Sequence, residues 1–160
     1  MSDAIVIRPE RPDQPEVVAL LRALDAYLAS LYPPEANHIL SVQALLSAEV
    51  SFFVARAGRT LVGTGACRRM PAEPAAGGLA YGEIKRMYVD PAVRGQGVGT
   101  RMLAVLEQQL RDDGLAQALL ETGETQIEAV RLYQRAGYAR RAAFGGYPSN
   151  GLSVFFGKLL

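Results

Sequence analysis

The sequence predicts a mixed α/β fold, in which one sheet contains both antiparallel and parallel strands. Residues 50–68 read as two apolar strands joined by a tight turn, which is the pattern of an antiparallel hairpin. Residues 84–122 read as strand, glycine-rich loop, helix and strand, and such a unit places its two strands in parallel. A second strand pair at 138–159 completes the sheet.

The N-terminal part predicts one strand and two helices. A β-branched strand at 4–8 is followed by Asp13 and Glu16, spaced as in a capping box, and by leucines at helical spacing up to residue 31. Pro33 ends this helix because proline cannot continue it. A short helix at 42–46 follows, with Ser41 as its N-cap.

The middle of the chain predicts the hairpin and the parallel pair. Strands at 50–56 and 60–68 flank the turn Ala57-Gly58, and a loop leads to the strand at 84–89. The helix at 98–110 ends at Gly114, a residue that suits a helix C-terminus.

The strand at 116–122 completes the parallel unit. A helix at 126–135, strands at 138–142 and 152–159, and the loop 144–151 complete the order β-α-α-β-β-β-α-β-α-β-β.

Composition limits the function classes. We expect a single domain, 1–160, with 49% hydrophobic and 21% charged residues. A net charge of +1 provides no broad basic surface, so no nucleic-acid partner is expected. The chain has no run long and apolar enough for a membrane helix, and its first residues do not resemble a signal peptide, so we expect a cytoplasmic protein without a membrane partner. Cys67, the only cysteine, is expected to be a buried thiol rather than a nucleophile, and no metal is expected.

The glycine-rich loop R-G-Q-G-V-G-T at 94–100 predicts an anion site. Glycines before a helix let backbone N–H groups converge on a phosphate. The dinucleotide fingerprint fails because Thr100 occupies its third glycine position, and a P-loop fails because the Gly-Lys-Ser/Thr sequence is absent. The remaining pattern is R/Q-x-x-G-x-G/A, the pyrophosphate-binding pattern of coenzyme A proteins, which Arg94, Gly97 and Gly99 satisfy.

A second motif, A-V-R-L-Y-Q-R-A-G-Y at 129–138, follows at the expected distance, and with it essentially the whole chain resembles the GNAT superfamily of N-acetyltransferases. The closing segment 144–159 is similar to a small, poorly characterised bacterial branch of that family. The resemblance implies a sheet that splays between a fourth and a parallel fifth strand, with acetyl-CoA as cofactor in the splay. The implied cofactor-binding residues are Met87, Tyr88, Val89, Arg94, Gly95, Gln96, Gly97, Val98, Gly99, Thr100, Gln126 and Tyr133.

The implied reaction is direct attack of a primary amine on the thioester through a tetrahedral intermediate. It requires a base for the amine, a donor for the oxyanion and stabilisation of the thiolate. Glu83 is the catalytic base candidate by resemblance, although alternation along the strand also predicts an ion pair with Lys85. Tyr133 occupies the position of the family's general acid, although its helical stripe would equally suit a core tyrosine.

The acceptor is expected to be a small, amino-acid-like amine. Arg86, placed by alternation on the face opposite Glu83, could hold a carboxylate of such a substrate. The other substrate-binding candidates are Tyr27, Tyr32, Phe144 and Tyr147. The alternative function is an acyl-CoA-binding sensor with little or no catalysis. By analogy with many members of the family, a homodimer is also possible.

Overall fold

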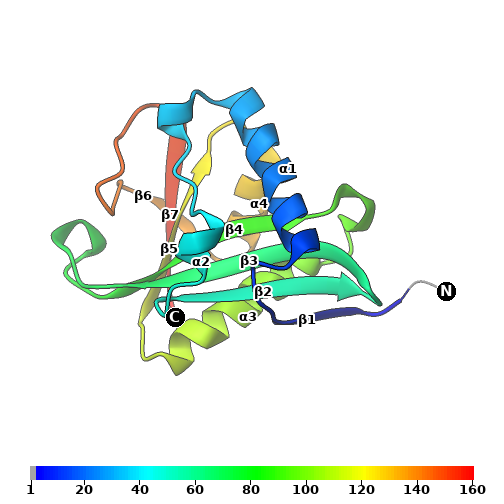
Figure 1. Ribbon diagram of the computed structural model, residues 1–160. Helices are drawn as coiled ribbons and strands as arrows, with labels where there is room; N and C mark the ends of the chain where they lie inside the picture. The colour runs from blue at the N-terminus through cyan, green and yellow to red at the C-terminus, as the bar shows by residue number, and fades with distance from the viewer. Residues whose placement is uncertain (1–2) are drawn as a thin grey trace.

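The protein contains one seven-stranded sheet with helices on both faces (Figure 1). The computed structural model describes residues 3–160. The strand order is β1-β2-β3-β4-β5-β7-β6, and every neighbouring pair is antiparallel except β4 and β5. The strands are β1 (Ile5–Pro9), β2 (Val50–Ala57), β3 (Thr60–Met70), β4 (Tyr81–Val89), β5 (Gln117–Gly123), β6 (Ala139–Arg141) and β7 (Ser153–Leu159).

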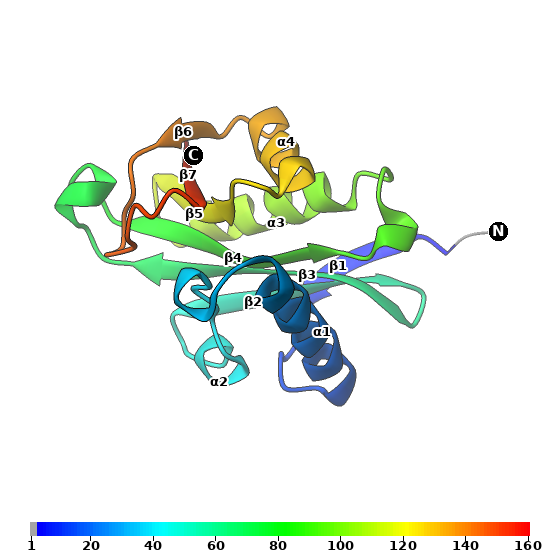
Figure 2. The ribbon, with the colours of Figure 1, turned by 90° about the horizontal axis from the view of Figure 1, so that it is seen from above.

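The helices divide between the two faces. In Figure 2, α1 and α2 lie on one side of the sheet, and α3 and α4 lie on the other. The helices are α1 (Pro15–Leu31), α2 (Val42–Leu45), α3 (Val98–Asp112) and α4 (Ile127–Arg135), with single 3₁₀ turns at Pro34–Ala36, Pro74–Ala76 and Pro91–Val93. The predicted fold class, element order and parallel β4–β5 pair are confirmed.

Each face of the sheet has its own hydrophobic core. On the α3 and α4 face, Met102, Leu106 and Leu110 of α3 pack on the sheet and are at most 1% exposed. On the α1 and α2 face, Val17 and Leu21 pack with residues of α2, β2 and β3. Cys67 belongs to the first core, and burial raises the pKa of its thiol to about 12, as expected for an inert cysteine.

The start of α1 differs from the prediction. The N-cap is Gln14, its side chain makes no capping hydrogen bond, and Pro15 opens the helix. Asp13 instead accepts two hydrogen bonds from Arg11, so the predicted capping box is wrong. A proline at the first helical position is already set to the helical φ, which supplies the start signal here. The predicted cap of α2 is confirmed, because the Ser41 hydroxyl accepts from the amide of Ala44.

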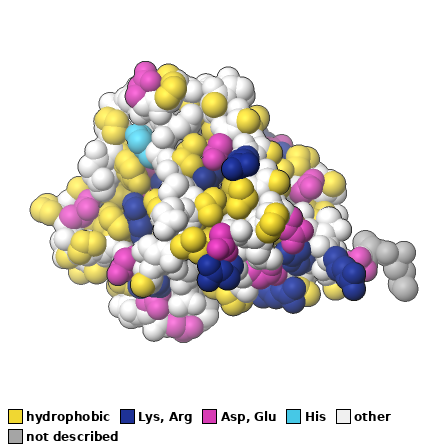
Figure 3. Space-filling model, in the orientation of Figure 1, with side chains coloured by type: hydrophobic (Ala, Val, Ile, Leu, Met, Phe, Trp, Pro, Cys, Tyr) yellow, Lys and Arg dark blue, Asp and Glu magenta, His cyan; other side chains and the backbone are white. Residues whose placement is uncertain are grey.

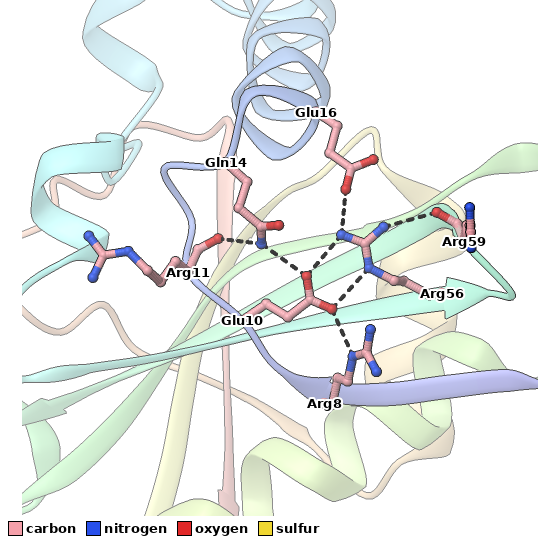
Figure 4. A network of polar contacts seen from close by, with 7 residues as sticks. All are labelled: Arg8, Glu10, Arg11, Gln14, Glu16, Arg56 and Arg59. Carbon is pink, nitrogen blue, oxygen red and sulfur yellow. Dashed lines mark hydrogen bonds and ion pairs between the residues drawn. The ribbon is translucent and has the colours of Figure 1, made fainter.

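A network of ion pairs joins the start of α1 to the sheet (Figure 4). Arg56 of β2, whose side chain is 9% exposed, donates to the carboxylates of Glu10 and Glu16. Arg8 and Gln14 also donate to Glu10, at 2.9 Å each. The network therefore fixes α1 against β1 and β2, at the edge of the sheet away from β5.

The parallel strands β4 and β5 separate soon after they meet. Their pairing extends over Gly82–Ala118, Glu83–Leu119 and Ile84–Leu120 only. Beyond Ile84, β4 continues to Val89 beside β3 with no partner on its β5 side among residues 3–160. A strand edge without a partner offers N–H and C=O groups to an extended, peptide-like ligand.

A β-bulge in β4 reverses the alternation of its side chains. The β3–β4 register shifts between Thr64 and Ala66, and Arg86 has a φ of 55°, which is unusual for a residue other than glycine. Ile84 and Met87 consequently pack on the same core. Arg86 points instead to the α1 face, where its guanidinium contacts Asp25. The predicted placement of Arg86 opposite Glu83 is wrong, because simple alternation holds only for a strand without a bulge.

Candidate active site

The N-terminus of α3 forms an anion cradle directly after β4. Gly95 and Gly97 have φ values of 82° and 78°, and a Cβ at either position would meet no atom within 4 Å. The first intrahelical hydrogen bond of α3 runs from the amide of Arg101 to the carbonyl of Gly97 at 3.0 Å. The amides of the preceding first turn therefore have no intrahelical acceptor, and they point out of the positive end of the helix. This open, glycine-lined cradle fits a pyrophosphate.

Two other residues of the glycine motif have structural roles that are visible in the fold. A Cβ on Gly99 would lie 2.9 Å from Leu132 Cδ2, so this glycine lets α3 and α4 approach closely. The Arg94 guanidinium donates to the carbonyl of Val89 at 3.1 Å and lies 3.4 Å from Glu128, with its side chain 49% exposed. Arg94 thus stands at the cradle with freedom to reach an anion.

A cavity of about 150 Å³ lies where β4 and β5 separate. Its walls come from β4, β5, the C-terminal half of α1, the segment that follows α1, and α4. The lining residues are Leu24, Leu28, Tyr32, Ala36, Asn37, His38, Ile39, Leu40, Ile84, Lys85, Arg86, Met87, Glu121, Thr122, Gly123, Gln126, Ala129, Tyr133, Leu152 and Ser153. Met87, Gln126 and Tyr133 of the predicted cofactor set are among them.

Tyr133 combines a buried ring with a hydroxyl at the cavity. The side chain is 6% exposed and packs edge-on against Tyr138, and burial raises the pKa of its hydroxyl. Among residues 3–160, Arg68 Nε is the only fully buried side-chain polar atom without a hydrogen-bond partner. The Tyr133 hydroxyl has no hydrogen-bond partner in that range either, so it is not sealed in the core, and we infer that it opens to the cavity that Tyr133 lines.

Tyr32 and Gly123 fit together at the end of β5. The Tyr32 hydroxyl shares a 2.6 Å hydrogen bond with Thr125, and a Cβ on Gly123 would lie 1.9 Å from the same hydroxyl oxygen. This contact brings the end of α1 across to β5 and gives Tyr32 a place in the cavity wall. Gln126 precedes α4 at the same end of the cavity.

Glu83 lies behind the cavity wall in a buried cluster. Its side chain is 1% exposed, and it is absent from the cavity lining. One carboxylate oxygen lies 2.6 Å from Arg68 Nη2, and the other accepts from the Tyr147 hydroxyl at 2.7 Å. Lys85 Nζ lies 3.7 Å from the second oxygen, so the ion pair that alternation predicts is present, with Arg68 as the nearer cation. Burial lowers the pKa of Lys85.

A histidine and a glutamate in the cavity wall were missed as a pair by sequence reasoning. His38 Nδ1 lies 2.8 and 2.9 Å from the two carboxylate oxygens of Glu121, although 83 positions separate the two residues. The sequence marks His38 only as a polar group near a helix end, and Glu121 only as a polar residue in an apolar strand. A carboxylate on a strand that leads into a predicted splay is the one signal that could have drawn attention to Glu121.

The predicted substrate-binding residues divide into two groups. Tyr32 and Arg86 line the cavity, although the Arg86 guanidinium already contacts Asp25 and donates to the carbonyl of Leu40. The other three do not line it. Tyr27 is 55% exposed on α1, Phe144 is 1% exposed in a separate core with Tyr81 and Phe155, and Tyr147 stacks on His38.

Charges of both signs are mixed across the visible face rather than gathered in one patch (Figure 3). Within the described chain, 3–160, no helix is long and apolar enough to span a membrane. The same residues contain no cluster of three His, Cys, Asp or Glu side chains suited to a metal ion.

Comparison with known proteins agrees with this geometry. The model of the acetyltransferase (GNAT) family matches residues 17–138. The chain is 44% identical over 156 residues to the "IAA acetyltransferase" of Azospirillum brasilense, with 98% of each chain covered. It is 36% identical to a solved Klebsiella pneumoniae protein assigned to the acyl-CoA N-acyltransferases, with a TM-score of 0.76 and 98% and 97% of the two chains covered.

A more distant structure shows the same fold. The PaiA N-acetyltransferase of Thermoplasma acidophilum, solved with coenzyme A, has 17% identity, a TM-score of 0.74 and coverage of 98% and 99%. The cradle at α3, the splay of β4 and β5 and these matches lead to one conclusion: the chain belongs to the GNAT family of acetyltransferases, and its cofactor is acetyl-CoA.

Proposed function

We propose that residues 1–160 form a single N-acetyltransferase domain that transfers the acetyl group of acetyl-CoA to a primary amine of a small molecule. The observation that carries the proposal is the cavity of about 150 Å³ at the β4–β5 splay, which adjoins the Tyr133 hydroxyl. A cavity of this size suits a small acceptor group. The wall contains one carboxylate, Glu121, beside His38, and both can contact an amine. The two cations of the wall already have partners, because Lys85 donates to the His38 carbonyl and Arg86 is paired with Asp25.

The chain's own residues supply positioning and charge stabilisation in this reaction. The cradle amides and Arg94 hold the pyrophosphate, and the unpaired edge of β4 from Met87 to Val89 aligns the pantetheine arm. The acceptor nitrogen then attacks the thioester carbonyl directly. The Tyr133 hydroxyl donates a hydrogen bond to the departing sulfur. Because burial raises its pKa, hydrogen bonding rather than complete proton transfer is its main contribution.

Glu83 has a positioning role in this proposal. Its carboxylate is shared between Arg68 and Tyr147, and it is separated from the cavity by the wall that Lys85 and His38 help to form. It acts on the acceptor site by fixing the Tyr147 side chain, on which His38 stacks.

The test is release of free thiol from acetyl-CoA across a panel of amino acids, polyamines and aromatic amines, with the matching alcohols as controls. We expect turnover with at least one amine and none with its alcohol. Tight binding of coenzyme A without turnover of any amine would contradict the proposal and favour the acyl-CoA sensor. Greater thermal stabilisation by NAD or ATP than by coenzyme A would contradict the proposal that the cradle binds the pyrophosphate of coenzyme A.

A further inference from the structure

Two groups in the cavity wall, His38 and Glu121, have so far been given no step in the chemistry. His38 comes from the segment between α1 and α2, and Glu121 comes from β5 just beyond its last pair with β4. Their side chains are 19% and 9% exposed, and the imidazole and the carboxylate lie within 2.8 Å of each other. A carboxylate held against one nitrogen of an imidazole is the arrangement that prepares the other nitrogen to accept a proton.

The contact with Glu121 sets the state of the imidazole ring. A carboxylate only accepts hydrogen bonds, so His38 Nδ1 carries a hydrogen, and in the neutral ring Nε2 then carries the lone pair. Within residues 3–160, Nε2 has no hydrogen-bond partner. It is also absent from the fully buried unpartnered side-chain atoms, of which Arg68 Nε is the only one in residues 3–160. Nε2 is therefore accessible, in a side chain that lines the cavity.

One further contact with the imidazole and two supporting contacts hold His38 in place. The His38 ring stacks on Tyr147 with 4.8 Å between ring centroids and 27° between planes. Lys85 Nζ donates to the His38 carbonyl at 2.7 Å. The Tyr147 hydroxyl is tied to Glu83 at 2.7 Å. Residues of β5 and of the loop before β7 thus contact the imidazole, and Lys85 of β4 holds the backbone of the same residue, which limits the motion of His38.

We propose that His38 is the catalytic base that takes the proton from the acceptor ammonium, with Glu121 as its positioning residue. This inference rests on the proposed N-acetylation. One N–H bond of the ammonium breaks, and its proton moves to Nε2 and later to solvent. The freed lone pair forms the new C–N bond, and the C–S bond breaks with its electron pair on sulfur. A second proton leaves the nitrogen and ends on the thiolate, which leaves one N–H on the amide product.

Charged and polar groups of several elements surround His38. Glu121 of β5 contacts its ring, Tyr147 of the late loop stacks on it, and Lys85 of β4 donates to its carbonyl. Arg86 of β4, which lines the same cavity, is paired with Asp25 of α1. The Glu121 carboxylate stabilises the imidazolium formed by proton transfer. A protonated imidazole has no lone pair to accept the proton, so we expect kcat/KM to fall on the acid side of its pH profile.

The decisive experiment is the pH profile of kcat/KM for the wild-type chain, His38→Gln and Glu121→Gln, with the exposed Glu124→Gln as the matched control. We expect His38→Gln to lower kcat/KM at pH 7 by about 10²- to 10⁴-fold and to lose the histidine limb of the profile. Coenzyme A affinity should stay unchanged. Glu121→Gln should keep the acid limb of the pH profile but have a lower kcat/KM, and Glu124→Gln should match the wild type in both respects. A wild-type rate and profile in His38→Gln would overturn the assignment.

A second readout does not depend on activity. His38 is the only histidine, so its ¹⁵N-imidazole signals in the full chain need no assignment. We expect the Nδ1–H tautomer in the wild type and a mixture of tautomers in Glu121→Gln. An Nε2–H tautomer, or no response to Glu121→Gln, would overturn the pairing. A wild-type chain that acetylates no amine but shows the expected tautomer would instead locate the failure in the proposed function.

Discussion

The Tyr147 hydroxyl donates a 2.7 Å hydrogen bond to the Glu83 carboxylate, joining two residues that lie 64 positions apart. The contact links β4 to the loop before β7 and sits behind the wall of the acceptor cavity. Tyr147 in turn stacks on His38, which lines the cavity. The hydrogen bond to Glu83 therefore restrains the ring against which His38 packs. The contact supports the proposal that Glu83 positions neighbouring groups while another residue transfers the proton.

Glu83→Gln should destabilise the fold more than it changes the chemistry. The substitution leaves the Arg68 guanidinium without its charge partner next to a carboxamide that is almost fully buried, so we expect a loss of about 3 kcal/mol in the free energy of unfolding. Urea denaturation measures this loss. The pH profile of kcat/KM should keep its acid limb. If that limb disappears in Glu83→Gln and persists in His38→Gln, Glu83 is the base.

Tyr133→Phe should lower kcat with little change in coenzyme A affinity. The variant removes one hydrogen bond to an ionised sulfur, and such a bond corresponds to a rate loss of about 10- to 100-fold. Tyr138→Phe is the matched control, because Tyr138 packs against Tyr133 but gives its hydroxyl to Glu107 at 2.9 Å. The control should lose stability and keep kcat. Equal kcat values for Tyr133→Phe and the wild type would exclude Tyr133 from the mechanism.

We expect Gly97→Ala and Gly99→Ala to destabilise the protein for different physical reasons. Alanine at position 97 meets no neighbour but is strained at a φ of 78°, which costs about 1 kcal/mol and disturbs the cradle. Alanine at position 99 fits the backbone but pushes Leu132 away and loosens the contact of α3 with α4. Adding Leu132→Ala should relieve the strain of Gly99→Ala and leave the effect of Gly97→Ala unchanged. Calorimetric melting and coenzyme A titration measure both variants, and rescue of Gly97→Ala would contradict the steric account.

The Glu10–Arg56 network should make stability depend on acidic pH. Hydrogen bonding from Arg56 lowers the pKa of Glu10 from 4.5 to about 2, so the folded state binds this proton less readily than the unfolded chain. The contribution is complete above pH 4.5 and is lost as pH falls toward 2, and it amounts to at most about 3 kcal/mol. Urea midpoints between pH 2 and 7 should show a weaker acid slope for Glu10→Gln than for Glu124→Gln. Identical slopes would contradict the role of Glu10.

Local patterns in the sequence are enough to predict the element order, the parallel β4–β5 pair and the cradle at α3. These features follow from local patterns, since alternation, helical spacing, prolines and glycines act over a few residues. The position of Tyr133 also followed from a motif, and the structure places it in the cavity wall. Even at this level the proline-led start of α1 was mistaken for a capping box.

Which charged groups contact one another becomes visible only in the folded chain. The bulge at Arg86 depends on how β4 pairs with β3, and it moves the guanidinium to the α1 face. The contact of His38 with Glu121 depends on a segment after α1 crossing to the end of β5. Ion pairs and hydrogen bonds form between groups that are close in space, and these groups can be far apart in the sequence. The acceptor site that we propose is assembled from such long-range contacts, whereas the glycine-lined cradle at α3 is built on one continuous stretch of chain.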